Sequence, residues 1–277
     1  MLSLTKFNTH VKPKQLLNYG DVFTTVKLLG EGHFGKTYLV MDKKSGKKYA
    51  LKVMPPSPDY EREVSTLISL SKPCTIDFVC YYDAFTLKMN NKLYYAILTE
   101  YIDGVTLREY DEKYGLSYNN ILSIGRWLLR TIGKLHKHGI AHNDISLDNV
   151  MVTKEGRLKL IDFGLSCNIY KRSGNNCVGN RKANMNYVSP ELVSGKIFVD
   201  PNKYSKTSDI FSIGVLLYDL ITLRKPYKYD EDYHIISRYI HIHKEPCLDD
   251  ALHHMLYVNP DTRANATQAY QLWSRCN

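Results

Sequence analysis

The chain has little that would place it in a membrane or among disulfide-rich secreted proteins. None of its 277 residues belongs to an apolar run long enough to span a membrane, and the first residues lack the apolar centre of a signal peptide. Its 6 cysteines are scattered without a CxxC pair, and no His/Cys spacing suits zinc. We therefore expect reduced thiols in a cytosolic or nuclear protein that does not bind a membrane.

Charge is only moderately unbalanced. Lys and Arg number 37 against 28 Asp and Glu, which gives a formal net charge of +9. The basic residues are dispersed, except for a short cluster at 43–48 around Ser45-Gly46 that is typical of a hairpin turn. We therefore predict no direct nucleic-acid binding, although a basic chain is attracted to acidic surfaces. The composition is that of a globular enzyme, with 44% hydrophobic and 23% charged residues.

The periodicity of the chain changes after its first third. Residues 22–53 and 78–101 alternate β-branched and aromatic residues with polar ones, and residues 60–70 between them have helical periodicity. In the remainder, an amphipathic helix is expected at 121–138, and a helix too apolar to lie at a surface at 208–223. The pattern predicts an α+β fold.

Three segments are expected along the chain. Residues 1–20 are polar, contain Pro13 and suggest an N-terminal extension. Residues 21–102 form the β-rich part and residues 103–277 the helical part, with the hinge near 101–105. The sequence shows no internal repeat.

Glycines at Gly30, Gly32 and Gly35 have the spacing GxGxxG, which alone is a weak signal. In a dinucleotide-binding fold this motif leads from a strand into a helix. Here residues 36–40 read as another strand, so the motif is expected at the tip of a β-hairpin. Glycines at such a tip allow backbone N–H groups to approach phosphates.

Lys52 ends an apolar strand that follows the glycine-rich hairpin. Most lysines in such a place simply extend their charge into water. Here Glu63 lies on the next expected helix and could hold the ammonium against the phosphates of a nucleotide. Glu61 is the weaker candidate because it lies off that helical face.

Three further motifs follow in order. His142 to Asn149 reads H-x-D-x-x-x-x-N, Asp162-Phe163-Gly164 comes next, and Ser189-Pro190-Glu191 comes later. With the glycine-rich hairpin and Lys52, this set resembles the eukaryotic protein-kinase family from about residue 23 to the end. The resemblance implies a bilobal fold, with a β-rich N-lobe, a helical C-lobe and an ATP cleft between them.

The resemblance also implies roles for individual residues. Asp144 would orient the substrate hydroxyl and accept its proton, Lys52 and Glu63 would position ATP, and Asn149 and Asp162 would bind Mg²⁺. The alternative is that Asp144, Asn149 and Asp162 are only loop caps and turn residues, but their joint spacing argues against that.

Further residues are implied in nucleotide binding. Thr99 would be the gatekeeper, and the Glu100 carbonyl and Ile102 N–H would read adenine. The complete set of implied nucleotide-binding residues is Gly30, Gly32, Phe34, Gly35, Ala50, Lys52, Thr99, Glu100 and Ile102.

The sequence departs from the family at three positions. Asn143 replaces the arginine of His-Arg-Asp, which defines a non-RD variant and predicts activity without activation-loop phosphorylation. Ser146 replaces a lysine near the γ-phosphate, and Asn184 replaces the threonine that contacts this lysine. The paired change is easier to reconcile with a rewired site than with decay.

Substrate and origin are also suggested by resemblance. The segment around Ser189 follows the serine/threonine pattern, and Asp148 and Asp219 match positions that hold a substrate arginine in basophilic kinases. The His-Asn-Asp variant and an Asn/Tyr-rich composition resemble protein kinases of large DNA viruses such as baculoviruses, which would imply small Arg-rich DNA-packaging substrates.

Two structural residues and two alternatives complete the expectations. Asp209 resembles the aspartate that anchors the catalytic loop, and Arg263 resembles the arginine that pairs with Glu191. One alternative is an ATP-binding pseudokinase or scaffold, for which Ser146 is the best argument. The other is a kinase of small molecules, which Ser189-Pro190-Glu191 and Arg263 disfavour.

Overall fold

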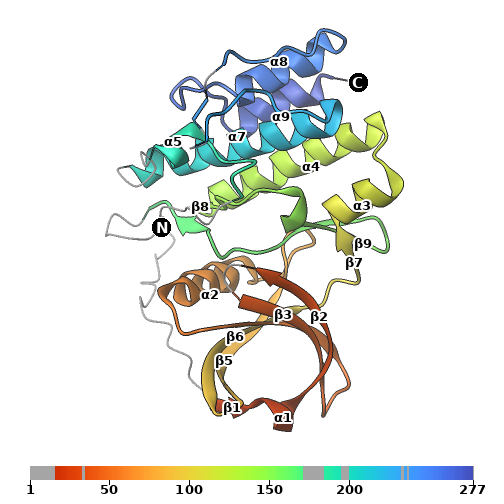
Figure 1. Ribbon diagram of the computed structural model, residues 1–277, viewed down its shortest axis with the longest axis vertical. Helices are drawn as coiled ribbons and strands as arrows, with labels where there is room; N and C mark the ends of the chain where they lie inside the picture. The colour runs from red at the N-terminus through yellow and green to blue at the C-terminus, as the bar shows by residue number, and fades with distance from the viewer. Residues whose placement is uncertain are drawn as a thin grey trace. The chain divides into compact units, whose positions relative to one another are not determined.

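The computed structural model describes residues 16–32, 35–170, 184–194, 200–231, 234–235 and 237–276. The chain divides into two compact units, Met1–Asp103 and Gly104–Asn277 (Figure 1). The first unit is rich in strands and the second in helices, which confirms the predicted α+β class.

The first unit contains one 6-stranded sheet with the order β1-β5-β6-β4-β3-β2. Its curved strands are visible in Figure 1. All neighbouring strands are antiparallel except β1 and β5. The elements are β1 (Leu16–Asn18), α1 (Tyr19–Val22), β2 (Phe23–Gly32), β3 (Gly35–Asp42), β4 (Lys48–Met54), α2 (Pro58–Leu70), β5 (Tyr81–Met89) and β6 (Lys92–Glu100). The segment expected as an extension up to residue 20 thus contributes a strand and a helical turn.

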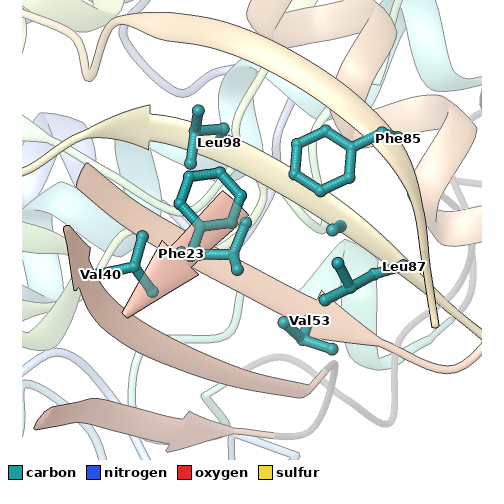
Figure 2. Close-up of a cluster of buried hydrophobic side chains, with 8 residues drawn as sticks. Phe23, Val40, Val53, Phe85, Leu87 and Leu98 are labelled. Atoms are coloured by element: carbon teal, nitrogen blue, oxygen red, sulfur yellow. The ribbon is translucent and has the colours of Figure 1, made fainter. Parts of the chain in front are cut away.

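The core of this unit lies on one face of the sheet, where the labelled side chains of Figure 2 point toward one another. Its rings stack, with the Phe23 and Phe85 centroids 6.0 Å apart. On β4, Leu51 and Val53 are buried, and Lys52 between them is less buried. Since successive strand residues point to opposite faces, burial of Leu51 and Val53 turns Lys52 to the other face. Loss of the Leu51 side chain to alanine would cost about 2–5 kcal/mol.

Two tight turns carry the chain between neighbouring strands. Gly46 donates its N–H to Asp42 O at 2.8 Å between β3 and β4, which confirms the predicted hairpin turn. Asn90 and Asn91, between β5 and β6, have φ of 50° and 58°. Left-handed backbone at both central residues is what a two-residue hairpin needs, and asparagine tolerates it.

The second unit contains helices and short strands. Its helices are α3 (Leu107–Tyr114), α4 (Tyr118–Lys137), η1 (Leu147–Asn149), α5 (Pro190–Val193), α7 (Pro201–Thr222), α8 (Pro246–Met255) and α9 (Ala266–Ser274). Its strands are β7 (Gly104–Thr106), β8 (Ile140–Ala141), β9 (Val150–Thr153), β10 (Leu158–Leu160) and β11 (Cys167–Asn168). They pair as β10-β9-β7 and β11-β8. No helix in the described part of the chain is long and apolar enough to span a membrane.

The helices begin and pack as their sequences indicate. Ser117 caps α4 by accepting a hydrogen bond from Asn120 N, and the Asn120 side chain completes a capping box. In α7, all residues from 210 to 218 are buried, and only Ser212 and Gly214 among them lack a large side chain. Burial on every side is expected for a helix that is apolar all round. A Cβ on Gly125 of α4 would lie 2.3 Å from the Trp273 ring on α9, so this contact requires glycine.

The cysteines differ from the expectation. The structure pairs Cys74 with Cys80 and Cys247 with Cys276, with Cα separations of 5.4 and 5.6 Å. These separations fall in the normal disulfide range. The prediction of reduced thiols is therefore wrong for these four residues, because folding brings together cysteines whose sequence spacing gives no motif.

Candidate active site

Lys52 and Glu63 form an ion pair within the first unit. Lys52 Nζ on β4 donates to Glu63 Oε1 at 2.8 Å and to Oε2 at 2.9 Å. The two side chains are only 14% and 5% exposed. Charges with so little water around them need a partner. The structure therefore selects Glu63, as the sequence favoured, as the residue that holds the lysine.

Helix α2 places Glu63 by packing its apolar face on the sheet. Tyr60, Val64 and Leu67 are buried, and the Tyr60 ring lies 4.6 Å from that of Tyr95 on β6. These residues share one face because they recur at helical spacing. Glu63 precedes Val64, so it lies at the border of this face, within reach of β4.

The glycine-rich segment forms the hairpin tip that the sequence predicts. Gly32 pairs with Gly35, and Gly30 pairs with Thr37, between β2 and β3. Gly35 has φ of 144°, and a Cβ there would lie 2.2 Å from Val53 O, so the fold itself requires this glycine. At Gly30 and Gly32 a Cβ would meet nothing within 4 Å. Their lack of side chains leaves room for another group, which fits a nucleotide phosphate.

The residues expected around adenine lie on adjacent strands. Ala50 on β4 is directly opposite Thr99 on β6, and Tyr49 is opposite Glu100. The Glu100 side chain accepts a hydrogen bond from Cys80 N at 2.9 Å, which fixes the end of β6 just before Ile102. Phe34 lies outside the described residues. The nucleotide roles of these residues stay predictions.

Asp144 is the centre of a hydrogen-bond network in the second unit. Asn149 Nδ2 donates to Asp144 O at 2.8 Å and to Asp144 Oδ2 at 2.9 Å. Asn184 N donates to the other carboxylate oxygen, Oδ1, at 3.2 Å. The structure thus brings Asp144 and Asn149 together as their spacing predicts, and the carboxylate is oriented from two sides.

The environment of Asp144 makes its carboxylate more basic. Burial raises the pKa of Asp144 above its usual range, and the negative charge of Asp162 acts in the same direction. His142 and the hydrogen bonds from Asn184 and Asn149 lower the pKa and only partly offset this rise. A carboxylate with a raised pKa is a better proton acceptor, as catalysis by a general base requires.

Asp162 is held in an unusual backbone conformation. Its φ is 55°, a left-handed value that costs a non-glycine residue about 1–3 kcal/mol. Its Oδ1 accepts a hydrogen bond from Gly164 N at 3.1 Å. The buried Phe163 ring packs 5.0 Å from the His142 ring. Such strain is retained where a side chain must point in a particular direction.

His142 is a packed histidine of the loop. Its Nε2 lies 3.1 Å from Ile161 O, a carbonyl that can only accept a hydrogen bond. Its Nδ1 accepts from Asp144 N at 3.3 Å. Both ring nitrogens are therefore engaged in holding the two segments that carry Asp144 and Asp162.

The fully buried Asp209 of α7 anchors the loop backbone. It accepts hydrogen bonds from His142 N at 2.9 Å and Asn143 N at 2.7 Å. His136 Nε2 lies 2.9 Å from the same carboxylate. Asn143 has φ of 62°, so these contacts also hold a strained residue in place. His136 was missed in the sequence because it lies in a helix, away from any motif.

The three positions that depart from the family all make hydrogen bonds within the second unit. Asn143 Nδ2 donates to Leu165 O at 3.3 Å. Ser146 is 1% exposed, and its carbonyl accepts from Asn149 N at 3.2 Å. Asn184 contacts Asp144 through its backbone, while its side chain accepts from Asn186 N at 3.2 Å. The contact between residue 184 and Asp144 therefore does not depend on the side chain that differs.

Asn149 and Asp162 offer the oxygen ligands that Mg²⁺ prefers. The Asn149 amide nitrogen is used by Asp144, which leaves its oxygen for a cation. Among the described residues, no group of three or more His, Cys, Asp or Glu side chains could hold a metal ion. The oxygens of Asn149 and Asp162 suit a magnesium ion whose other ligands would be phosphates and water.

Two ion pairs near this loop were not expected. Arg108 donates to both oxygens of Asp148 at 2.7 and 2.8 Å, and Lys225 Nζ donates to Asp219 at 2.9 Å. The two aspartates were predicted to be functional from the sequence, but their cationic partners were not. Arg108 and Asp148 are 40 residues apart, so no local pattern signals their contact.

Arg263 and Glu191 form the buried pair that the resemblance implies. Arg263 Nη2 donates to Glu191 Oε2 at 2.9 Å, Nη1 contacts Oε1, and Nη1 also donates to Thr207 O at 2.8 Å. Both side chains are fully buried. This bidentate pair joins the segment after Ser189-Pro190 to the C-terminal part of the unit.

Comparisons with known proteins agree with this geometry. A family model described as the protein kinase domain matches residues 23–273. A probable serine/threonine-protein kinase of Dictyostelium discoideum is 29% identical over 76% of this chain and 49% of its own length. A probable serine/threonine-protein kinase of Streptomyces coelicolor is 32% identical over 85% of this chain and 34% of its own length.

Mouse serine/threonine-protein kinase Nek5 is 26% identical over 89% of this chain and 39% of its own length. The chain thus spans about a third to a half of the length of these curated relatives. The match of the family model covers nearly all of the chain and includes every motif described above. The chain belongs to the protein kinase domain family.

Proposed function

We propose that this chain transfers the γ-phosphate of ATP to serine or threonine hydroxyls of a protein substrate. The observation that carries the proposal is the orientation of Asp144 by Asn149 and Asn184 in a site that raises the Asp144 pKa. The serine/threonine kinase names of the relatives support the acceptor type.

In the proposed reaction, Asp144 accepts the proton of the substrate hydroxyl as the hydroxyl oxygen bonds to the γ-phosphorus. The bond from that phosphorus to the bridging oxygen breaks, and ADP leaves with the electron pair. Lys52, held by Glu63, binds the α and β phosphates. Asn149 and Asp162 would hold Mg²⁺, which would offset the negative charge of the phosphates.

ATP and Mg²⁺ are typical of the family and are proposed here on the fit of the residues. Gly30 and Gly32 leave room for phosphates, and the Asn149 oxygen and the Asp162 carboxylate suit a hard cation. Residence in the cytosol or nucleus and the absence of nucleic-acid binding remain expectations from composition alone.

The expectation of basic substrates has less support. It depended on Asp148 and Asp219, and both carboxylates already bind cations of the chain itself. We therefore do not include basic residues of the substrate in the proposed function.

The pseudokinase alternative is favoured by a single observation. The buried Ser146 supplies no positive charge near the phosphates, where the family has a lysine. Against it, Lys52, Glu63, Asp144, Asn149 and Asp162 are all present in this sequence.

Single-turnover transfer of ³²P from γ-labelled ATP to a mixed protein panel separates the two functions. We expect Mg²⁺-dependent labelling of seryl and threonyl residues by the wild-type protein. The matched control is Asp144→Asn, which keeps the size of the side chain and removes the base. Wild-type transfer no faster than this control would establish the pseudokinase function.

A further inference from the structure

Two ion pairs of the second unit converge on one tyrosine. Arg108 on α3 binds Asp148 with both arms of its guanidinium, and its Nη2 also lies 3.4 Å from the Tyr187 hydroxyl. Lys225 binds Asp219, and its Nζ lies 4.8 Å from the centre of the Tyr187 ring. We call these five residues the Tyr187 cluster.

The Tyr187 cluster connects to the proposed base by two routes. Asp148 is followed directly by Asn149, whose amide donates to Asp144. On the other side, Tyr187 N donates to Asn184 O at 2.9 Å, and Asn184 N donates to Asp144. The cluster therefore lies beside the position where a substrate hydroxyl would react.

The charged members of the cluster are partly accessible, whereas the tyrosine is not. The Arg108 and Asp148 side chains are 36% and 46% exposed, and those of Lys225 and Asp219 are 33% and 25% exposed. Tyr187 is 3% exposed and gives both cations a fixed partner. A substrate segment could thus reach the carboxylates, but only in competition with cations already in place.

An incoming arginine or lysine gains little in that competition. The two cations of the cluster balance its two carboxylates, so its net charge is zero. A planar guanidinium bound to both carboxylate oxygens is the strongest arrangement of this kind. Displacing it leaves Arg108 without its acceptor, and the tethered cation has the advantage of a high effective concentration.

We propose that Arg108 and Lys225 are specificity-determining residues that prevent the enzyme from selecting basic residues next to the acceptor hydroxyl. The inference rests on the proposed phosphotransfer function and concerns the substrate side of the same site. On this basis, the enzyme phosphorylates substrate segments that have no arginine or lysine at the positions facing Asp148 and Asp219. Removal of the two cations would free two carboxylates and create a preference for basic residues.

The test uses two serine peptides that differ only in arginine or alanine at the positions preceding the acceptor. We would measure kcat/KM for phosphotransfer, and the Kd for each peptide by fluorescence anisotropy. The variants are Arg108→Ala/Lys225→Ala and the matched control Lys113→Ala/Arg224→Ala. The control removes the same two charges from exposed neighbouring positions.

For the wild-type protein and the control variant, we expect the two peptides to differ by less than about threefold in either quantity. For Arg108→Ala/Lys225→Ala, the preference for the arginine peptide should rise by about tenfold or more in both quantities. A wild-type preference for arginine above tenfold, or an unchanged ratio in the double variant, would overturn the proposal.

The design keeps failure of the inference distinct from failure of the proposed function. If the wild-type protein transfers no phosphate to any substrate, the phosphotransfer function fails, and the anisotropy measurement still decides the inference. If the double variant does not fold, as circular dichroism would show, the single variants Arg108→Gln and Lys225→Gln replace it. A wild-type preference for the arginine peptide above tenfold would overturn the inference without any variant.

Discussion

The two units hold their candidate catalytic residues in different ways. In the first unit, Lys52 is positioned by Glu63, through one ion pair between the side chains of a strand and a helix. In the second unit, Asp144 is positioned by its neighbours in the catalytic loop, and the buried Asp209 anchors the backbone of that loop. A single side-chain pair can break and re-form without unfolding its unit. A loop whose backbone is bound by a buried carboxylate changes its conformation only if the core around that carboxylate changes.

At the candidate catalytic residues, backbone strain follows the same division. The second unit holds Asn143 and Asp162 at φ of 62° and 55°, and both are at or beside the proposed catalytic residues. Lys52 and Glu63 lie within a regular strand and a regular helix. The second unit therefore uses part of its folding energy to keep its site in one conformation.

The largest expected effect is that of Asp144→Asn. The amide keeps the size of the side chain but cannot accept the substrate proton, so the single-turnover transfer rate should fall on the order of 10²–10⁴-fold. Nucleotide affinity, measured with a fluorescent ATP analogue, should change little. A wild-type rate in this variant would show that Asp144 is not the base.

Asp209→Ala tests the anchored loop. It leaves His142 N and Asn143 N buried without their acceptor, so the free energy of unfolding should fall by about 3 kcal/mol. Urea unfolding followed by circular dichroism measures this. Asp250→Ala, on the exposed side of α8, is the control and should change stability by less than about 0.5 kcal/mol. Equal stability of the two variants would contradict the anchoring role.

Glu63→Gln tests the ion pair of the first unit. The amide removes the charge that holds Lys52, so kcat/KM for ATP should fall by about 30-fold, a change of roughly 2 kcal/mol. Stability should also fall, because the amide no longer offsets the charge of the nearly buried Lys52. Glu61→Gln is the matched control. If Glu61→Gln lowered kcat/KM for ATP more than Glu63→Gln, Glu61 and not Glu63 would be the residue that positions Lys52.

The raised pKa of Asp144 predicts the pH dependence of the reaction. Only the ionised carboxylate accepts a proton, and a pKa above the usual range means that ionisation is lost at a higher pH than for an exposed aspartate. Below that pKa the rate should fall about tenfold per pH unit. A pH profile of single-turnover transfer, with an acid limb at the pKa of an ordinary aspartate, would contradict the prediction.

Ser146→Ala should have the smallest effect. A serine donates a neutral hydrogen bond at most, so its loss should slow transfer by about tenfold or less. Ser146→Lys with Asn184→Thr restores the usual pair of the family and should be tolerated. If Ser146→Ala slowed transfer as much as Asp144→Asn, Ser146 would have a catalytic role that one neutral hydrogen bond does not explain.

Sequence motifs predicted the parts of the site that lie close together along the chain. Asp144 and Asn149 are 5 residues apart, and a fixed loop conformation brings them into contact. The pairing of Lys52 with Glu63 was predicted because the expected helix that carries Glu63 comes directly after the strand that carries Lys52.

Contacts between distant segments could not be predicted in this way. Three kinds of contact depend on how the elements pack, which no local pattern encodes. They are the contact of His136 with Asp209, the ion pair of Arg108 with Asp148 and the cysteine pairs. The parallel pairing of β1 with β5 was missed for the same reason, because a segment of 3 residues is too short to show a pattern that identifies a strand.

The contact of Gly125 with Trp273 has an evolutionary consequence. The indole of Trp273 fills the space above Gly125, and its Nε1 donates to Leu122 O at 2.9 Å, so the two positions behave as one packing unit. A larger residue at position 125 is compatible with the fold only if the ring at 273 is reduced as well. In an alignment of kinases of this type, we expect the two positions to co-vary, with glycine opposite tryptophan and larger residues opposite smaller side chains.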